Sequence, residues 1–200
     1  MDCFDETIDF IHSNPAITNI GLHGNFAEGK PVTNFKYLEF LDAEGNWNPD
    51  LTGKLPQLLN KEILVAFAAE LNAQMERALS GKINITHIDS HLHQHTLPSF
   101  YNIYIDFAKR HEIQLRLAQT YREGSYTKYW YRKFLNNEIK SSQIARSDFF
   151  ETVDKFLSFG DEHPAGKTEL MIHPDFDAAG KLFDHVDGTS MEKWIAYLRV

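Results

Sequence analysis

The most informative segment of the chain is Ile85-Thr86-His87-Ile88-Asp89-Ser90-His91-Leu92-His93-Gln94-His95. It holds four of the chain's ten histidines. The residues leading into it, Lys82–Thr86, alternate in polarity and are partly β-branched, and Pro98 follows closely, so we expect a strand that runs out into a loop. Alternate side chains of an extended segment point the same way, so the odd-numbered residues, the four histidines and Asp89, are expected to project from one edge.

Clustered imidazoles on a stiff backbone are the donors that a borderline divalent ion prefers, and the stretch therefore predicts a metal site. Two other interpretations of the spacing stay open. The first is a histidine-rich loop that holds no ion, with at most one packed histidine and the others in solvent. The second is a helix, which would bring His87 to His91 and His91 to His95 at four-residue intervals.

The composition of the chain limits its class. Its 200 residues, 42% of them hydrophobic, are expected to form a single domain over residues 1–200. A net charge of -8 argues against the broad basic surface that nucleic acids require, so no nucleic-acid partner is expected. No stretch approaches the ~20 apolar residues of a membrane span, the start does not resemble a signal peptide, and Cys3 is the only cysteine. We therefore expect a cytoplasmic protein that does not bind membranes.

Apolar periodicity predicts alternating helices and strands. Helices are expected over Phe4–Ile11, Leu55–Ser80, Phe100–His111 and Ser142–Phe159, with a last helix that starts at a capping box of Thr189 and Glu192. Strands are expected over Ile17–His23, from Lys82 into the histidine stretch, over Ile113–Leu117 and over Thr168–His173. Phe26–Pro56 is rich in Gly, Pro, Asn and Asp and predicts a long loop, in which Trp47 and Tyr37 either lie over a sugar or cover the core.

This alternation requires a parallel sheet, either a (β/α) barrel or a doubly wound sheet. In both folds the carboxyl ends of the strands build the site. His23, the histidine stretch, Arg116 and His173 all fall at such ends. Segments that are distant in the sequence are therefore expected to converge on one rim.

Three motifs carry a resemblance to a known family. Gly21–Pro31 (GLHGNFAEGKP) resembles the GLHLNLTEGKP segment of the YdjC-like carbohydrate deacetylases, the family of chitooligosaccharide deacetylase. Thr86–His95 (THIDSHLHQH) is similar to that family's THxDSHxHxH signature, and Glu169–Pro174 (ELMIHP) to its E(L/V)MCHP motif. A Leu-Arg pair, here Leu115-Arg116, lies between them. The three motifs occur in the family's order, which makes the match more specific than a lone His-Xaa-His.

The resemblance implies a distorted (β/α) barrel of parallel strands and one divalent metal ion, zinc or magnesium. The implied ligands are His23, His91 and an aspartate from an ADDFG segment, whose other carboxylate would be the general base. The chain has no Asp-Asp dipeptide, so we expect that the first strand and helix are missing at the N-terminus and that the last strand is missing too. Gly24, where the family has leucine, is a smaller departure.

The implied activity is metal-dependent removal of the N-acetyl group from an N-acetylated sugar or chitooligosaccharide, impaired in this chain by the missing segment. We expect His173 to donate the proton to the leaving amine and Arg116 to orient reacting groups. Asp89 or His93 is expected to fix the imidazole tautomers. His87 and His95 are expected to be structural rather than ligands.

Two alternatives remain at this point: a different metallohydrolase, and a non-catalytic remnant that binds metal or sugar. The expected partner is a small carbohydrate. The sequence leaves the sugar, the ion and the oligomeric state, including a homo-oligomer, undecided.

Overall fold

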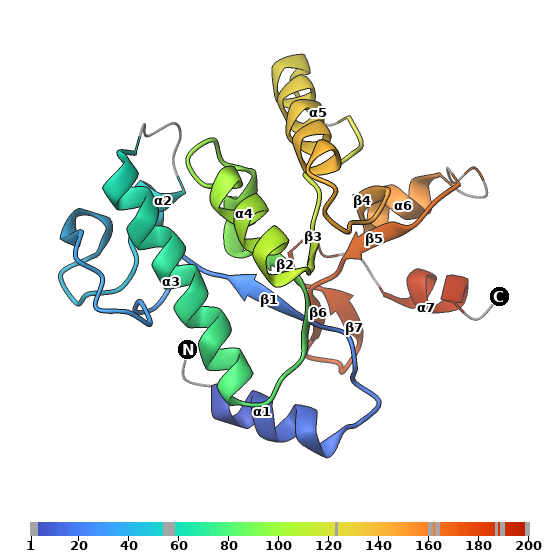
Figure 1. Cartoon of the computed structure of the whole chain (residues 1–200). Helices are drawn as coiled ribbons and strands as arrows, with labels where there is room; N and C mark the ends of the chain where they lie inside the picture. Colours follow the sequence, from blue (N-terminus) through green and yellow to red (C-terminus); the bar gives the residue numbers. More distant parts are fainter. Residues whose placement is uncertain are drawn as a thin grey trace. The chain divides into compact units, whose positions relative to one another are not determined.

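The computed structural model describes residues 4–53, 59–122, 124–159, 162, 165–186, 188 and 191–198 (Figure 1). The chain divides into two compact units. Unit 1 comprises Met1–Ala118 and Phe134–Arg146, and unit 2 comprises Gln119–Lys133 and Ser147–Val200. Whether the two units make the single domain expected from the sequence stays a prediction.

Helices and strands alternate along most of the chain. In order, the elements are α1 (Phe4–Ser13), β1 (Ile20–Gly24), η1 (Leu38–Phe40), α2 (Pro49–Thr52), α3 (Lys61–Ser80), β2 (Ile85–Ser90), η2 (His91–Thr96), α4 (Tyr101–His111), β3 (Gln114–Leu115), α5 (Tyr126–Ser141), β4 (Phe149–Thr152), α6 (Val153–Ser158), β5 (Thr168–Met171), β6 (Pro174–Phe176), β7 (Leu182–Asp184) and α7 (Glu192–Leu198). η1 and η2 are 3-10 helices.

Unit 1 is built on a parallel sheet with the strand order β1-β2-β3. The register pairs His23 with Asp89 and Ile88 with Leu115. Helices α3 and α4 contact each other and pack against β1 and β3 respectively. Because parallel strands need crossover connections, α3 and α4 return the chain so that the carboxyl ends of the strands lie together. The expected α/β fold with parallel strands is therefore present, whereas the barrel form stays a prediction.

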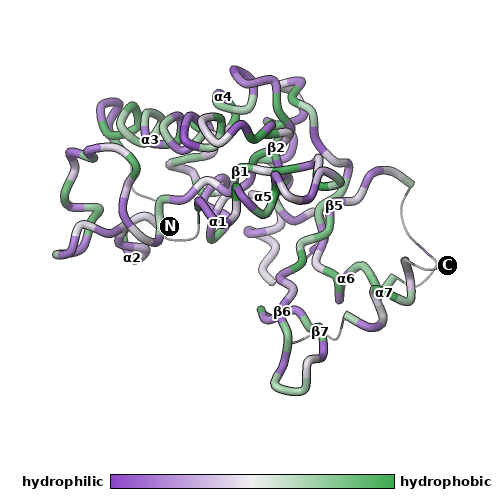
Figure 2. The backbone as a smooth tube through the Cα atoms, turned by 90° about the horizontal axis from the view of Figure 1, so that it is seen from below, coloured by the Kyte–Doolittle hydropathy of each residue, from purple (hydrophilic) through white to green (hydrophobic). Residues whose placement is uncertain are grey.

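Helix α3 begins and ends at residues whose side chains or backbone satisfy its free polar groups. The Asn60 side chain accepts a hydrogen bond from the Ile63 amide at 2.9 Å, and Gly81 is the C-terminal cap. Phe67, Leu71 and Met75 recur on its buried face, and Figure 2 shows hydrophobic and hydrophilic stretches alternating along the helix. The predicted start at Leu55 cannot be compared, because residues 54–58 lie outside the described residues. Leu59 and Asn60 themselves precede the helix.

The long loop after β1 folds onto this helix through aromatic side chains. Trp47 is 3% exposed, its ring stacks on that of Phe67 with centroids 5.7 Å apart, and Phe35 contacts both. The rings of Phe26 and Phe100 also contact Phe67. Of the two uses expected for Trp47, the structure therefore shows the one that covers the core.

Unit 2 contains a second parallel pair, β4 and β5, in which Phe149 pairs with Thr168. Helix α6 packs against both strands, and Phe150 and Val153 are buried. Strands β6 and β7 form an antiparallel hairpin that the sequence pattern did not predict.

The expected helix over Ser142–Phe159 is wrong. Its apolar residues have helical spacing, but Phe149–Thr152 instead forms β4, and only Val153–Ser158 is helical. Pairing with β5 decides this, because a short apolar run suits a buried strand as well as a helix. The helix lies earlier, in α5, where Leu135 and Ile139 are buried four residues apart. The many tyrosines before them obscured this signal.

The predicted helix near Phe4–Ile11, the one after Pro98 and the last helix are confirmed as α1, α4 and α7. Thr189 of the expected capping box lies outside the described residues. Within the described part of the chain, no helix combines the length and apolarity needed to cross a membrane.

Candidate active site

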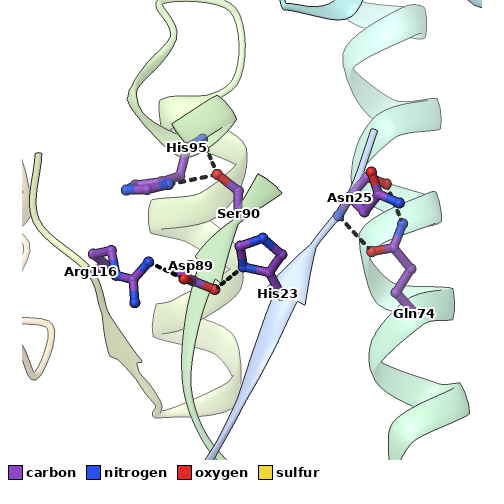
Figure 3. A network of polar contacts seen from close by, with 7 residues as sticks. All are labelled: His23, Asn25, Gln74, Asp89, Ser90, His95 and Arg116. Atoms are coloured by element: carbon purple, nitrogen blue, oxygen red, sulfur yellow. Dashed lines mark hydrogen bonds and ion pairs between the residues drawn. The ribbon is translucent and has the colours of Figure 1, made fainter. Parts of the chain in front are cut away.

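Three strands deliver polar side chains to the carboxyl end of the unit 1 sheet. His23 comes from β1, Asp89 from β2, and Arg116 directly follows β3. Figure 3 shows Asp89 between the other two. His23 Nδ1 donates a hydrogen bond to Asp89 Oδ1 at 2.7 Å, and Arg116 forms an ion pair with the other carboxylate oxygen. The predicted convergence of these three segments is therefore present.

The surroundings of Asp89 keep it ionised. Burial acts to raise the pKa of the carboxyl group, but the hydrogen bond from His23 and the charge of Arg116 outweigh it and hold the pKa below its ordinary value. A carboxylate that accepts from Nδ1 fixes one tautomer of the His23 imidazole, with Nε2 left as the electron-pair donor. The His23 side chain is 55% exposed, so the ring is open to solvent.

His91 lies beside His23. Their ring centroids are 5.6 Å apart, with the planes inclined at 72°. His91 Nε2 is buried and makes no hydrogen bond, although a carboxylate oxygen of the exposed Glu28 lies 3.3 Å away. Two imidazoles from distant segments therefore meet at one rim, as the sequence predicted.

The expectation that all the odd-numbered residues of the histidine stretch project from one edge is wrong. Strand β2 ends at Ser90, and η2 turns the chain, with Leu92 and His93 in the left-handed region at φ 49° and 53°. His93 is thereby turned toward His95, with ring centroids 6.1 Å apart. Its predicted role in fixing the tautomer of a ligand stays a prediction, whereas Asp89 makes a direct contact with His23.

His95 is directed into the core and not to the rim. It is 3% exposed, and its Nδ1 lies 2.6 Å from Ser90 Oγ, which also accepts a hydrogen bond from the His95 amide (Figure 3). Burial, followed by the charge of His93, lowers the pKa of His95 from 6.5 to about 3. The ring is therefore neutral at pH 7, and this burial agrees with the structural role expected for His95.

Two glycines of β1 make room for neighbouring side chains. A Cβ atom at Gly21 would lie 2.3 Å from Nε2 of His87, so that ring packs against bare backbone. A Cβ atom at Gly24 would lie 2.7 Å from the hydroxyl of the buried Tyr104. The glycine that replaces the leucine of the family's first motif is therefore required by the position of Tyr104.

The histidine pair opens onto a cleft of about 610 Å³. Its lining side chains are mainly polar or charged: His23, Asn25, Glu28, Lys30, Asn46 and His91, with Gly29 between them. Sequence reasoning assigned no role to Asn25, Glu28, Lys30 or Asn46. A signal existed for the first three, because they belong to the Gly21–Pro31 motif. Asn46 belongs to the long loop and carries no such signal.

The side chains at the cleft supply part of a binding site for a divalent ion. His23 Nε2 and His91 Nε2 both lack a hydrogen-bonding partner among the described residues, and neutral imidazoles suit zinc in particular. In the described ranges, however, no three His, Cys, Asp or Glu side chains come together as a metal-binding group. The pair therefore supplies two donors, and the described residues do not complete the set.

His173, the expected proton donor, belongs to unit 2. Its amide donates to Asp184 Oδ2 at 2.7 Å, its ring Nδ1 lies 3.5 Å from Asp184 Oδ1, and the ring of His185 is 5.6 Å away. The role of His173 stays a prediction.

Comparison with known proteins supports the resemblance seen in the motifs. The model of the YdjC-like protein family matches residues 1–197. A carbohydrate deacetylase from Vibrio parahaemolyticus serotype O3:K6 (strain RIMD 2210633) is 28% identical over 184 residues, which cover 88% of this chain and 64% of that protein. A chitooligosaccharide deacetylase from Yersinia pestis (strain Pestoides F) is 26% identical over 191 residues, which cover 90% of this chain and 66% of that protein. The chain thus spans slightly under two thirds of the length of these relatives.

A solved structure has a similar fold. The crystal structure of a protein from Enterococcus faecalis V583, described as a cellobiose-phosphate cleavage protein, superposes with a TM-score of 0.62 at 18% identity, over 87% of this chain and 67% of that one. At this identity the likeness concerns the fold alone. The match of the family model along nearly the whole sequence decides the relationship: the chain belongs to the YdjC-like family.

Proposed function

We propose that the protein takes part in metal-dependent hydrolysis of the N-acetyl group of an N-acetylated sugar or chitooligosaccharide. One observation carries the proposal: His23, held by Asp89, lies next to His91 at the rim of a polar cleft. The names of the relatives, carbohydrate deacetylase and chitooligosaccharide deacetylase, support the same reaction.

His23 and His91 would hold the ion, which we propose is zinc or magnesium. Imidazole donors favour zinc, while a site with further oxygen donors would accept magnesium. When bound, such an ion polarises a carbonyl oxygen and makes a bound water molecule more acidic. The third donor and the general base are not identified among the described residues.

The remaining residues of the site hold and orient these groups. Asp89 fixes the His23 ring, and Arg116 keeps Asp89 ionised through their ion pair. Lys30, Glu28 and Asn46 offer charged and amide groups to the hydroxyls of a sugar in the cleft. We retain His173 as the proposed proton donor to the leaving amine.

The finer structural predictions also remain proposals. We propose that the parallel strands belong to a distorted (β/α) barrel, which the alternation of parallel strands with α3 and α4 supports. The proposed cytoplasmic location rests on the sequence alone, and the oligomeric state, including a homo-oligomer, stays open.

Two measurements test the proposed function. Calorimetric titration with zinc and with magnesium should show uptake of one ion per chain, and acetate should be released from N-acetylglucosamine oligomers when that ion is present. Release of phosphate from sugar phosphates instead of acetate would favour a different metallohydrolase. Metal uptake without release of either product would favour the non-catalytic interpretation, and absence of both uptake and acetate release would overturn the proposal.

A further inference from the structure

One wall of the cleft is a short arch of backbone, residues Asn25–Val32. It contributes Asn25, Glu28, Gly29 and Lys30 to the cleft lining. A loop that carries binding groups needs a defined position, because each group that moves must be ordered when a ligand binds. The structure shows how the two ends of this arch are held.

Gln74 of α3 holds the first end of the arch, at Asn25. The Asn25 amide donates to Gln74 Oε1 at 3.0 Å, and Gln74 Nε2 donates to the Asn25 carbonyl at 2.8 Å (Figure 3). The next amide, that of Phe26, donates to Gln94 Oε1 at 3.0 Å. Both backbone polar groups of one residue, Asn25, are thus satisfied by a single side chain, as they would be by a neighbouring strand.

Glu70, one turn earlier on α3, holds the second end of the arch, at Val32 and Thr33. Its Oε1 accepts from the Val32 amide at 2.8 Å, and its Oε2 accepts from the Thr33 amide at 2.8 Å and from Thr33 Oγ1 at 2.6 Å. Gln74 Nε2 also donates to Glu70 Oε1 at 3.0 Å, which joins the two attachments. Glu70 is 0% exposed, and these hydrogen bonds come from neutral donors.

Burial of a carboxylate costs free energy unless its oxygens are well satisfied, and an apolar side chain would serve packing alone better. Three hydrogen bonds from one loop, at Val32 and Thr33, therefore indicate that Glu70 serves to fix the position of that loop. Hydrogen bonds also hold the arch between its two ends. Asn25 Oδ1 accepts from the amides of Ala27 and Glu28, and Asn25 Nδ2 donates to the Glu28 carbonyl. The Gly29 carbonyl accepts from the Trp47 amide at 2.8 Å.

We propose that Glu70 and Gln74 are positioning residues, which hold the arch Asn25–Val32 as a wall of the cleft and thereby set the affinity for the sugar. The proposal rests on the function proposed above for the same site. Neither residue touches the histidine pair in the contacts of the described residues, so their effect is on binding and not on the chemical step.

The test compares Glu70→Gln and Gln74→Leu with Glu62→Gln and Glu76→Gln, whose exposed side chains lie on the same helix. Hydrogen exchange measured by mass spectrometry should rise in peptides that cover residues 25–33 in the first pair only. The KM for N-acetylglucosamine oligomers should rise about five- to tenfold with kcat changed less than about twofold, because binding common to ground and transition states is lost. Thr33→Val, which removes a single hydrogen bond, should give the same pattern more weakly and serves if Glu70→Gln does not fold.

Two outcomes would overturn the proposal: exchange that rises equally in α3 and the β1–β2 pair, or an unchanged KM despite a loosened arch. Absence of acetate release from the unmodified protein would refute the proposed function separately. Calorimetric binding of the same oligomers would then replace KM, and equal affinities of Glu70→Gln and Glu76→Gln would refute the role of the arch.

Discussion

Two neighbouring residues of β2, Asp89 and Ser90, hold two histidines in opposite surroundings. Successive residues of a strand face opposite sides, so Asp89 reaches His23 at the cleft and Ser90 reaches His95 in the core. The His23 side chain is 55% exposed, and its ring is polarised by a carboxylate. His95 is 3% exposed, and its ring is held by a hydroxyl group.

A single histidine-rich motif can therefore contain histidines with different roles. A carboxylate on Nδ1 strengthens Nε2 as a donor to a metal ion, whereas the Ser90 hydroxyl bonds Nδ1 of the buried His95 ring without adding charge. We therefore expect the cleft region, His23, Asp89, His91 and Arg116, to govern metal binding. The core region, Ser90, His95 and Tyr104, is expected to govern stability.

The largest expected effect separates the two regions directly. His91→Ala should lower the affinity for zinc by more than about 100-fold, beyond the range of about 10- to 100-fold that follows loss of an orienting neighbour. His95→Gln should leave that affinity nearly unchanged but lower the stability, because it leaves a poorly filled site in the core. Calorimetric titration and urea unfolding measure the two quantities. His111→Ala, on α4, is the control, and equal zinc uptake by His91→Ala and His111→Ala would remove the proposed site.

Asp89→Asn tests whether the carboxylate supports the cleft region. The amide of asparagine carries no negative charge and so holds and polarises the His23 ring less strongly. The affinity for zinc should therefore fall by about 10- to 100-fold. Arg116, whose side chain is 15% exposed, would also lose its ion pair with Asp89, and the free energy of unfolding should fall by about 1–3 kcal/mol. Asp106→Asn on the exposed side of α4 is the matched control. Unchanged affinity in Asp89→Asn would show that the orientation of His23 has another cause.

The pH dependence of stability tests the core region. The folded pKa of His95, about 3, lies below its ordinary value of 6.5, so the unfolded chain binds the additional proton. The stabilisation from this neutral ring is complete above pH 6.5 and is lost as the pH falls toward 3, at a slope of at most about 1.4 kcal/mol per pH unit. Urea unfolding between pH 7 and 4.5 measures this slope, while the lowered pKa of Asp89 places its titration below the window. His95→Gln should flatten the slope, and a variant as pH-dependent as the unmodified chain would contradict the assignment.

The smallest expected effect concerns Glu28. Its carboxylate is 72% exposed and lies 3.3 Å from His91 Nε2, so solvent screens the pair. Glu28→Gln should change the free energy of unfolding by less than about 0.5 kcal/mol and the affinity for zinc by less than about twofold. Thermal unfolding and zinc titration check both values. A much weaker zinc affinity would identify Glu28 as a further donor and would enlarge the cleft region.

Much of the fold was predictable where the pattern is local. The period of Phe67, Leu71 and Met75 predicts α3, and the β-branched run before His87 predicts β2. The same reasoning failed at Phe149–Thr152, because a strand of four residues cannot be told from part of a helix until its partner β5 is known. Glu70 had a signal that was not used: it lies among the buried positions of α3, three residues after Phe67, where a solvated carboxylate is not expected.

The motifs alone establish the donor types and their order along the chain, since they place His23, Asp89, His91 and Arg116 at the ends of successive strands. The family resemblance implied that His23 and His91 lie together, but the spacing of the histidines could not show which of them share the cleft. That depended on the end of β2 at Ser90 and on the left-handed Leu92 and His93, which send His95 into the core. Register and backbone direction arise from contacts between distant segments, and the spacing of residues in one segment does not contain them.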